Sequence, residues 1–323
     1  MPAPADRPAL HVMAAVIRDP AGRVLIAKRA AQADQGGLWE FPGGKLEPGE
    51  ARVDGLVREL EEELGIAVQT AAPMLQVTHD YPNRRVLLDV FEVTAWGGDA
   101  HGREGQPLRW VDVGSLLGYS FPAANLPIVT AARLPRLCLV TPQPTSCNDP
   151  GWFMRLEACL ANGIRLVQLR AAGFSSADYA MLARRVVPLV QAAGAKVVLN
   201  AEPALALELG ADGVHLGSRR LRALASRPLP SPLLVSAACH DATELALAQR
   251  LQVDFLLVSP VAETRSHPGA PVLGFEGLSR LAAAANRPCY ALGGMTSADL
   301  PSAMEAGCLG IAAISGLWAE GRD

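Results

Sequence analysis

The first part of the chain alternates short apolar runs with one strongly charged stretch. The runs HVMAAVI (residues 11–17) and VLIAK (24–28) are rich in β-branched residues and predict two strands. A DPAG segment (19–22) separates them, and its turn-forming residues predict a hairpin between these strands. Two later runs, VLLDVFEV (86–93) and RWVDV (109–113), predict further strands.

Between these runs, three leucines predict one helix. Leu56, Leu60 and Leu64 recur every four residues, so they share one face of a helix over residues 53–64. Gly65 follows at once and predicts the helix end, because glycine readily adopts the left-handed conformation that closes a helix.

The second part of the chain keeps a steadier rhythm of buried-type strands and helices rich in Ala and Leu. Eight strands alternating with helices predict a closed (β/α)8 TIM barrel. An open doubly wound sheet fits the same pattern, because periodicity alone does not show closure. The eight apolar runs are residues 136–141, 166–171, 196–201, 213–217, 233–239, 255–260, 289–294 and 310–315.

Chain length and this change of rhythm predict two domains, both of the α/β class. The boundary is expected near residues 130–135, just ahead of the first barrel strand. We therefore expect one domain over residues 1–132 and a second over residues 133–323.

Composition limits the kinds of molecule that the protein is expected to bind and the compartment in which it is expected. Half of the 323 residues are apolar, 19% are charged and the net charge is −3, which suits small-molecule work and argues against direct nucleic acid binding. The six cysteines show no C-x-x-C pair, as in a reduced cytosolic protein. Residues 1–10 lack the apolar core of a signal peptide, and no uncharged apolar run is long enough to span a bilayer. A soluble cytoplasmic protein is expected.

The charged helix carries a candidate metal site. Glu59, Glu62 and Glu63 lie at i, i+3 and i+4, so the three carboxylates share one helix face. Arg58 beside them is expected to hold one of them through a bidentate contact. Crowded carboxylates repel one another unless a cation lies between them, and hard oxygen ligands suit Mg²⁺ or Mn²⁺. A solvated acidic helix face is the alternative for the glutamates taken alone.

The spacing around these glutamates favours the metal site. Gly44 is followed after five residues by Glu50, and after seven more by Arg58-Glu59-Leu60; Glu62-Glu63 and Gly65-Ile66 follow, each after one residue. The segment resembles the box of Nudix hydrolases at every defined position. The resemblance implies an α/β/α sandwich with a mixed sheet and a pyrophosphohydrolase activity. It implies metal binding by Glu59, Glu62, Glu63 and the Gly43 carbonyl, with Glu50 supporting the loop and the metal-bound water.

Further segments resemble the 8-oxo-dGTP diphosphatases of the MutT type. They are KRAAQADQGGLWEFPGGK, YPNRRVLL, GREGQP and FPAANLPI. The likeness implies hydrolysis of 8-oxo-dGTP to 8-oxo-dGMP and pyrophosphate, a reaction that cleans the nucleotide pool and supports faithful DNA replication and repair. It implies that Asn125 reads the oxidised base and that Arg29 and Arg84 contact base or phosphate. Phe41 would form a pocket wall, and Glu104 would be a carboxylate near the metal and a general base.

Two alternatives stay open for this first domain. Other Nudix substrates, such as ADP-ribose or dinucleotide polyphosphates, fit the box equally well, because the box names a chemistry and not a substrate. Asn125 lies between two prolines and is compatible with a plain turn, and Phe41 is compatible with a core position.

The second domain resembles thiamine phosphate synthase and its relative TenI. The likeness rests on VQLR (167–170), GVHLG (213–217), VSAACH (235–240), the stretch 259–278, ALGGM (291–295) and the closing GIAAIS (310–315). It implies a phosphate site made by Gly293, Gly294 and Ser315, which follow the last two strands.

The same segments depart from the synthase pattern. Ala171-Ala172 replace a lysine after QLR, Ala201 replaces an acid after Asn200, and Ser218-Arg219-Arg220 stand where another acid is expected. The missing acids would hold the Mg²⁺ of the synthase, so full synthase activity is not expected.

Three functions remain for the barrel. The first is a TenI-like isomerase with His240 as acid or base. The second is a domain that binds a phosphorylated ligand, such as a thiazole or thiamine phosphate. The third is an inert scaffold. His240 and His215 are also compatible with purely structural, hydrogen-bonded roles.

Overall fold

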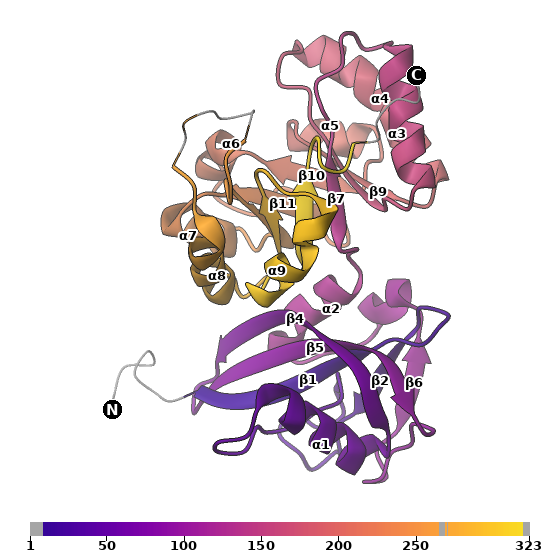
Figure 1. The fold of residues 1–323 in the computed structure, drawn as a ribbon, viewed down its shortest axis with the longest axis vertical. Coiled ribbons are helices and arrows are strands. Elements are labelled where there is room, and N and C mark those ends of the chain that lie inside the picture. The colour runs from indigo at the N-terminus through magenta and orange to yellow at the C-terminus, as the bar shows by residue number, and fades with distance from the viewer. Residues whose placement is uncertain (1–8, 265–268, 270, 319–323) are drawn as a thin grey trace. The chain divides into compact units, whose positions relative to one another are not determined.

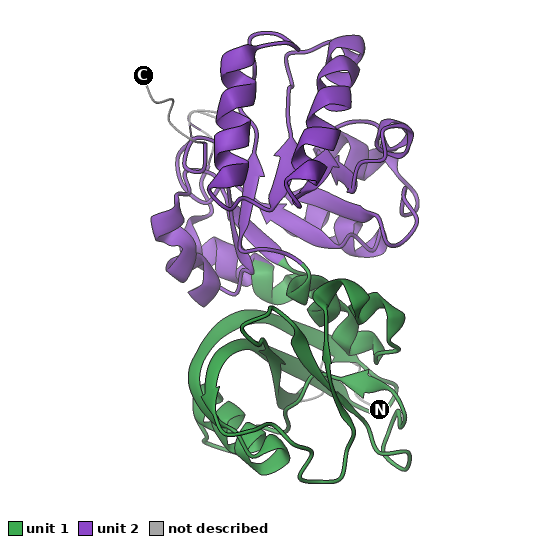
Figure 2. Cartoon of the chain, turned by 90° about the vertical axis from the view of Figure 1, so that its right-hand side faces the viewer, with its two compact units in different colours: residues 1–133, 282–288 green, residues 134–281, 289–323 purple. Residues whose placement is uncertain are grey.

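The computed structural model describes residues 9–264, 269 and 271–318. The chain forms two compact units, coloured separately in Figure 2. The first comprises residues 1–133 together with 282–288, and the second comprises 134–281 and 289–323. In the described residues, no helix combines the length and the apolar character that crossing a membrane requires.

The first unit contains two three-stranded sheets, and Figure 1 shows its helices α1 and α2 on opposite sides of the strands. In the order β1-β5-β4, β1 is parallel to β5 and β4 is antiparallel to it, so this sheet is mixed. The second sheet has the antiparallel order β3-β2-β6. The strands are β1 (Ala9–Ile17), β2 (Val24–Lys28), β3 (Trp39–Glu40), β4 (Ala67–Asp80), β5 (Arg85–Gly97) and β6 (Leu108–Val111).

The predicted hairpin between β1 and β2 is wrong, although the turn itself forms. Gly22 N–H donates to the Asp19 carbonyl over 2.8 Å, and Arg18 and Val24 form one isolated bridge. Beyond that bridge, β1 pairs in parallel with β5 along its whole length, and β2 pairs with β3 and β6 in the other sheet. Long-range pairing of the apolar β1 and β5 therefore overrides closeness in sequence.

Helix α1 (Arg52–Leu64) confirms the helix predicted from the leucine spacing. Leu56, Leu60 and Leu64 are fully buried in a core cluster that also contains Met13 of β1. Gly65 ends the helix in the left-handed conformation, with a φ of 69°. The buried leucine face fixes the rotation of α1 about its axis, and this rotation turns the glutamates of the other face outward.

Short helices follow β6 and precede the barrel. They are the 3₁₀ helices η2 (Val113–Gly118) and η3 (Ala123–Asn125), followed by α2 (Leu126–Ala132).

The second unit is a closed barrel of eight parallel strands, which confirms the predicted TIM barrel and excludes the open sheet (Figure 1). The strands are β7 (Leu137–Val140), β8 (Leu166–Leu169), β9 (Lys196–Leu199), β10 (Gly213–Leu216), β11 (Leu234–Cys239), β12 (Phe255–Val258), β13 (Cys289–Leu292) and β14 (Gly310–Ala313). The helices are α3 (Pro150–Ala161), α4 (Ser176–Ala192), α5 (Pro203–Glu208), α6 (Ser218–Ala223), α7 (Ala242–Arg250), α8 (Gly274–Ala285), η4 (Ser297–Asp299) and α9 (Leu300–Glu305).

Candidate active site

A glycine loop lies between β1 and the acidic face of α1. The Pro42 and Gly44 carbonyls accept hydrogen bonds from backbone N–H groups of β1, at 2.8 and 2.7 Å. Gly43 has a φ of 141°, and a Cβ atom there would overlap the Met13 carbonyl oxygen. A Cβ on Gly44 would overlap the Glu59 carboxylate. Glycine at position 43 therefore lets the loop backbone approach β1 this closely, and Gly44 leaves the space that the Glu59 carboxylate fills.

Glu63 is held against this loop. The Gly43 N–H donates to Glu63 Oε2 over 2.8 Å, and Gln106 Nε2 lies 3.4 Å from Glu63 Oε1. Burial, together with the nearby carboxylates of Glu40 and Glu104, raises the pKa of Glu63 to about 7, against the hydrogen bonds from Gly43 and Gln106 that lower it. Negative charge at this point is therefore only partly compensated by the protein.

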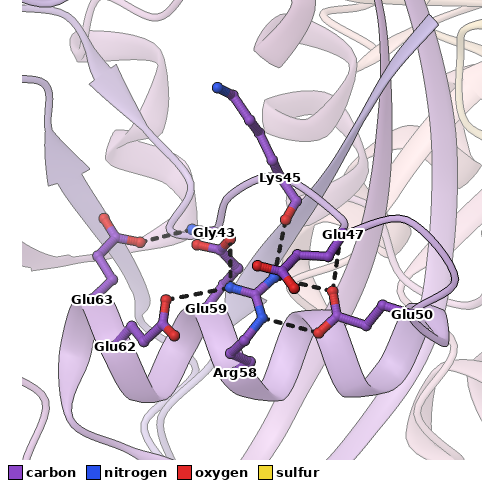
Figure 3. A network of polar contacts seen from close by, with 8 residues as sticks. All are labelled: Gly43, Lys45, Glu47, Glu50, Arg58, Glu59, Glu62 and Glu63. Carbon is purple, nitrogen blue, oxygen red and sulfur yellow. Dashed lines mark hydrogen bonds and ion pairs between the residues drawn. The ribbon is translucent and has the colours of Figure 1, made fainter.

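Arg58 connects the other acidic residues of the box, as Figure 3 shows. Its Nε and Nη2 donate to the two Glu50 oxygens over 2.9 and 3.0 Å, and Nη1 donates to Glu59 over 2.9 Å and to Glu62 over 3.3 Å. The bidentate partner is thus Glu50, and not one of the three helix glutamates as predicted. Hydrogen bonding to Arg58 lowers the pKa of Glu50. Arg58 also bonds the Lys45 carbonyl over 3.0 Å, so it fastens the loop to α1.

The donor set of this face fits a divalent cation, although it is not gathered around one point. Among the residues that the structure describes, no three His, Cys, Asp or Glu side chains are grouped so as to hold a metal ion. Glu59 and Glu63 both lie against the close-approaching glycine loop, whereas the Glu62 side chain is 63% exposed and turned to Arg58. Carboxylate and carbonyl oxygens with room for water are the ligands that hard divalent ions prefer.

Glu40 is a site residue that sequence reasoning missed. It forms an ion pair with Arg29, and burial raises its pKa, as does the nearby Glu104 carboxylate. The side-chain carboxyl groups of Glu40, Glu63 and Glu104 therefore lie close to one another, beside the glycine loop. The available signal was the position of Glu40 in WEFPGGK, three residues before Gly43.

Asn125 and Phe41 are in contact next to the glycine loop. Asn125 is only 9% exposed, and its Oδ1 lies 3.5 Å from the Phe41 N–H. The Phe41 ring stacks on Phe121 with 5.5 Å between ring centroids. Asn125 is therefore more than an exposed turn residue, and Phe41 belongs both to the core and to the segment that leads into the glycine loop.

Arg29 and Arg84 meet through Asp34. Arg29 Nε donates to the Asp34 carbonyl over 2.9 Å, and Arg84 forms an ion pair with the Asp34 carboxylate. The Arg84 guanidinium also lies over the Tyr81 ring at 5.5 Å, while its Nε is buried without a hydrogen-bond partner. The two arginines thus flank the 29–38 loop.

In the second unit, polar side chains line part of the barrel interior. Paired residues of neighbouring strands point to the same face of the barrel wall. The register pairs Gln168 with Val198, and Val198 with Gly213. His215 lies two residues after Gly213, on the same face, and pairs with Ser236. His215 Nδ1 lies 3.0 Å from Ser236 Oγ, and burial lowers the pKa of His215 to about 3, helped by the charge of nearby cationic side chains. His215 is accordingly a neutral interior residue, as its position in the strand predicted.

The other predicted barrel residues follow the carboxyl ends of their strands. Gly293 and Gly294 follow β13 with φ values of 102° and 71°, and Ser315 follows β14. His240 follows β11, and its Nδ1 lies 2.7 Å from Glu244 Oε2. The buried Glu244 fixes the orientation of the imidazole, which leaves its Nε2 as the side available to a ligand.

The barrel does not fit the magnesium ion that the synthase pattern implies. Arg220 Nε donates to Glu202 over 2.8 Å, and Nη1 donates to Asn200 Oδ1 over 3.0 Å. The residue after Asn200, where the synthase pattern has an acid, is the buried Ala201. One carboxylate that is already paired with a guanidinium is not a magnesium site.

Comparison with known proteins agrees with this architecture. A NUDIX domain model matches residues 13–131, and a thiamine monophosphate synthase model matches residues 137–317. The 8-oxo-dGTP diphosphatase of Escherichia coli K12 is 38% identical over 128 residues, 40% of this chain and 98% of that protein. The CTP pyrophosphohydrolase of the same strain is 39% identical over 123 residues, 38% of this chain and 90% of that protein. The thiamine-phosphate synthase of Laribacter hongkongensis is 35% identical over 177 residues, 54% of this chain and 83% of that protein.

The glycine loop, the acidic helix and the mixed sheet define the first unit as a Nudix pyrophosphohydrolase. The chain belongs to the Nudix family in its first part and to the thiamine monophosphate synthase and TenI family in its second.

Proposed function

We propose that the Nudix domain hydrolyses 8-oxo-dGTP to 8-oxo-dGMP and pyrophosphate in the cytoplasm, with Mg²⁺ as cofactor. The observation that carries this proposal is the buried Asn125 amide beside the Phe41 backbone. An amide both donates and accepts, so it can address O6 of the base and the N7–H that oxidation creates. Removal of this nucleotide from the pool would keep oxidised guanine out of DNA.

Glu59, Glu62, Glu63 and the Gly43 carbonyl would hold the Mg²⁺ or Mn²⁺ ion. When bound, the ion would offset phosphate charge and favour ionisation of the attacking water. Arg58 positions Glu59 and, through Glu50, the loop. The water oxygen bonds to phosphorus while the phosphorus–oxygen bond of the α–β bridge breaks, so no covalent enzyme intermediate forms.

Glu104 is the proposed base that takes the proton of this water. It is exposed to solvent and close enough to Glu63 to raise the pKa of that carboxyl. Arg29 and Arg84 would contact the base or the phosphates from the 29–38 loop.

A substrate screen with Mg²⁺ tests the proposal. The panel contains 8-oxo-dGTP, dGTP, CTP, ADP-ribose and a dinucleotide polyphosphate. We expect 8-oxo-dGTP to have the highest kcat/KM and to yield pyrophosphate as the first inorganic product. A higher kcat/KM for CTP or ADP-ribose, or initial release of inorganic phosphate, would contradict it.

For the barrel we propose binding of a phosphorylated ligand, such as a thiazole phosphate or thiamine phosphate, without synthase turnover. The observation that supports this role is that Arg220, which stands where the synthase pattern has an acid, bonds Glu202 and Asn200. A departing pyrophosphate needs its charge met in the transition state, and a guanidinium that binds ground and transition states alike does not speed its departure.

Calorimetry with thiamine phosphate and a synthesis assay with the two precursors test this role on the full chain. We expect measurable binding and no thiamine phosphate formed. Synthesis at a rate comparable to a thiamine-phosphate synthase would refute the argument from the missing acids. Absence of both binding and synthesis would favour the scaffold.

A further inference from the structure

The side chain of Arg220 reaches the mouth of the barrel from helix α6. It bonds Asn200, which follows β9 and lies two residues after Val198. Because strand side chains alternate between faces, Asn200 continues the interior face that also carries Gln168 and His215. The charge of Arg220 lowers the pKa of the buried His215, which agrees with this placement.

The interior next to this mouth has an unpartnered acceptor. Gln168 is 3% exposed, and its Oε1 has no hydrogen-bond partner. Buried polar atoms in folded proteins are nearly always paired, so this acceptor is open to a donor from a bound ligand or a water.

The charge of Arg220 is only loosely compensated. Its carboxylate partner Glu202 is 68% exposed, so solvent screens the ion pair and the carboxylate can turn away. Nη2 makes no hydrogen bond within the part of the chain that the structure describes, so one edge of the guanidinium remains for a further acceptor. A phosphate oxygen is an acceptor that suits this edge.

We infer that Arg220 supplies the positive charge that a metal ion supplies in a synthase, so that the barrel binds phosphate or diphosphate groups without any divalent cation. The inference rests on the proposed ligand-binding role of the barrel and identifies the group that holds the anion. Glu202 competes with the ligand for Arg220, and Asn200 keeps the guanidinium at the mouth.

Calorimetric titration of the full chain with inorganic pyrophosphate in excess EDTA tests the inference. We expect binding by the wild type and at least about tenfold weaker binding by Arg220→Gln. Arg219→Gln is the matched control, because Arg219 is an exposed neighbour on the same helix, and its affinity should stay within about twofold of the wild type. Glu202→Gln should bind more tightly, since it removes the competing carboxylate.

Each other outcome has a distinct meaning. Binding in EDTA that is equal in Arg220→Gln and Arg219→Gln overturns the role of Arg220 but leaves the ligand-binding proposal standing. Binding that appears only when Mg²⁺ replaces EDTA overturns metal-independent recognition. No binding of pyrophosphate or of thiamine phosphate, up to about 10 mM, overturns both proposals.

Discussion

Arg58 and Glu50 form a two-bond ion pair across the glycine-loop side of the Nudix site, with Nε–Oε1 and Nη2–Oε2 distances of 2.9 and 3.0 Å. The same guanidinium bonds Glu59 at 2.9 Å. The pair therefore ties the loop end at Glu50 to a proposed metal ligand, so the position of one depends on the other.

Replacing Arg58 by Lys should lower kcat by about 10- to 100-fold, because a lysine ammonium cannot make the planar two-bond contact and the proposed ligand Glu59 loses its orientation. The Mg²⁺ concentration for half-maximal activity should rise as well. Arg103→Lys is the control, since the Arg103 side chain bonds a backbone carbonyl of the same helix, that of Glu61 at 3.0 Å, and no carboxylate of the box. Equal Mg²⁺ activation curves for the two variants would remove the positioning role from Arg58.

Glu62→Gln should keep the fold and reduce turnover by about 10²-fold or more, through loss of charge at the metal. The side chain is 63% exposed, so the amide disturbs no packing. Glu61→Gln, the exposed neighbour, should retain wild-type turnover. Steady-state rates with saturating nucleotide distinguish the two, and a Glu62→Gln rate near that of Glu61→Gln would contradict the metal-site assignment.

The barrel residue Glu244 should contribute pH-dependent stability. Its side chain is 2% exposed and accepts bonds from Arg222 and His240. Although burial alone acts in the opposite direction, the hydrogen bonds, above all that to His240, leave the pKa of Glu244 below its usual 4.5. The carboxylate therefore stabilises the folded state above the unfolded pKa, and this contribution is lost as the pH falls through the lower folded pKa.

Glu244→Gln should accordingly lower the melting temperature at pH 7, with a loss of about 1–3 kcal/mol from the broken buried network. The difference from wild type should shrink at pH values below about 4. Glu208→Gln, in an exposed ion pair with Arg184, should change little at either pH. A difference for Glu244→Gln that is the same at pH 3.5 and 7 would exclude the carboxylate as its origin.

Regular patterns made most of the fold predictable. The leucine spacing predicts α1, and each of the eight apolar runs predicts one barrel strand. In these elements the secondary structure that the local sequence favours is also the one that buries the apolar residues. The 14-residue strand β4 was not predicted, because its pairing with β5 contains register shifts at Val68–Thr70, Thr70–Ala71 and Pro73–Leu75. These irregularities interrupt the alternation of polar and apolar residues that indicates a strand.

The site was predictable as a set of residues but not as a set of contacts. The spacing identified Arg58 and the glutamates, whereas the choice of Glu50 as bidentate partner depends on how the loop folds back onto α1. Glu40 was not predicted because its ion pair with Arg29, the residue after β2, depends on the register of β2 with β3, which the sequence does not show.

We propose above all that this Nudix domain prefers 8-oxo-dGTP because Asn125 reads the oxidised base. The most direct test is the ratio of kcat/KM for 8-oxo-dGTP to that for dGTP, measured for the wild type and for Asn125→Ala. We predict a ratio well above one for the wild type and a loss of about 1–3 kcal/mol of discrimination in the variant, roughly 5- to 150-fold, because a polar base edge is left unpaired. A wild-type ratio near one, or a ratio that Asn125→Ala leaves unchanged, would contradict the account.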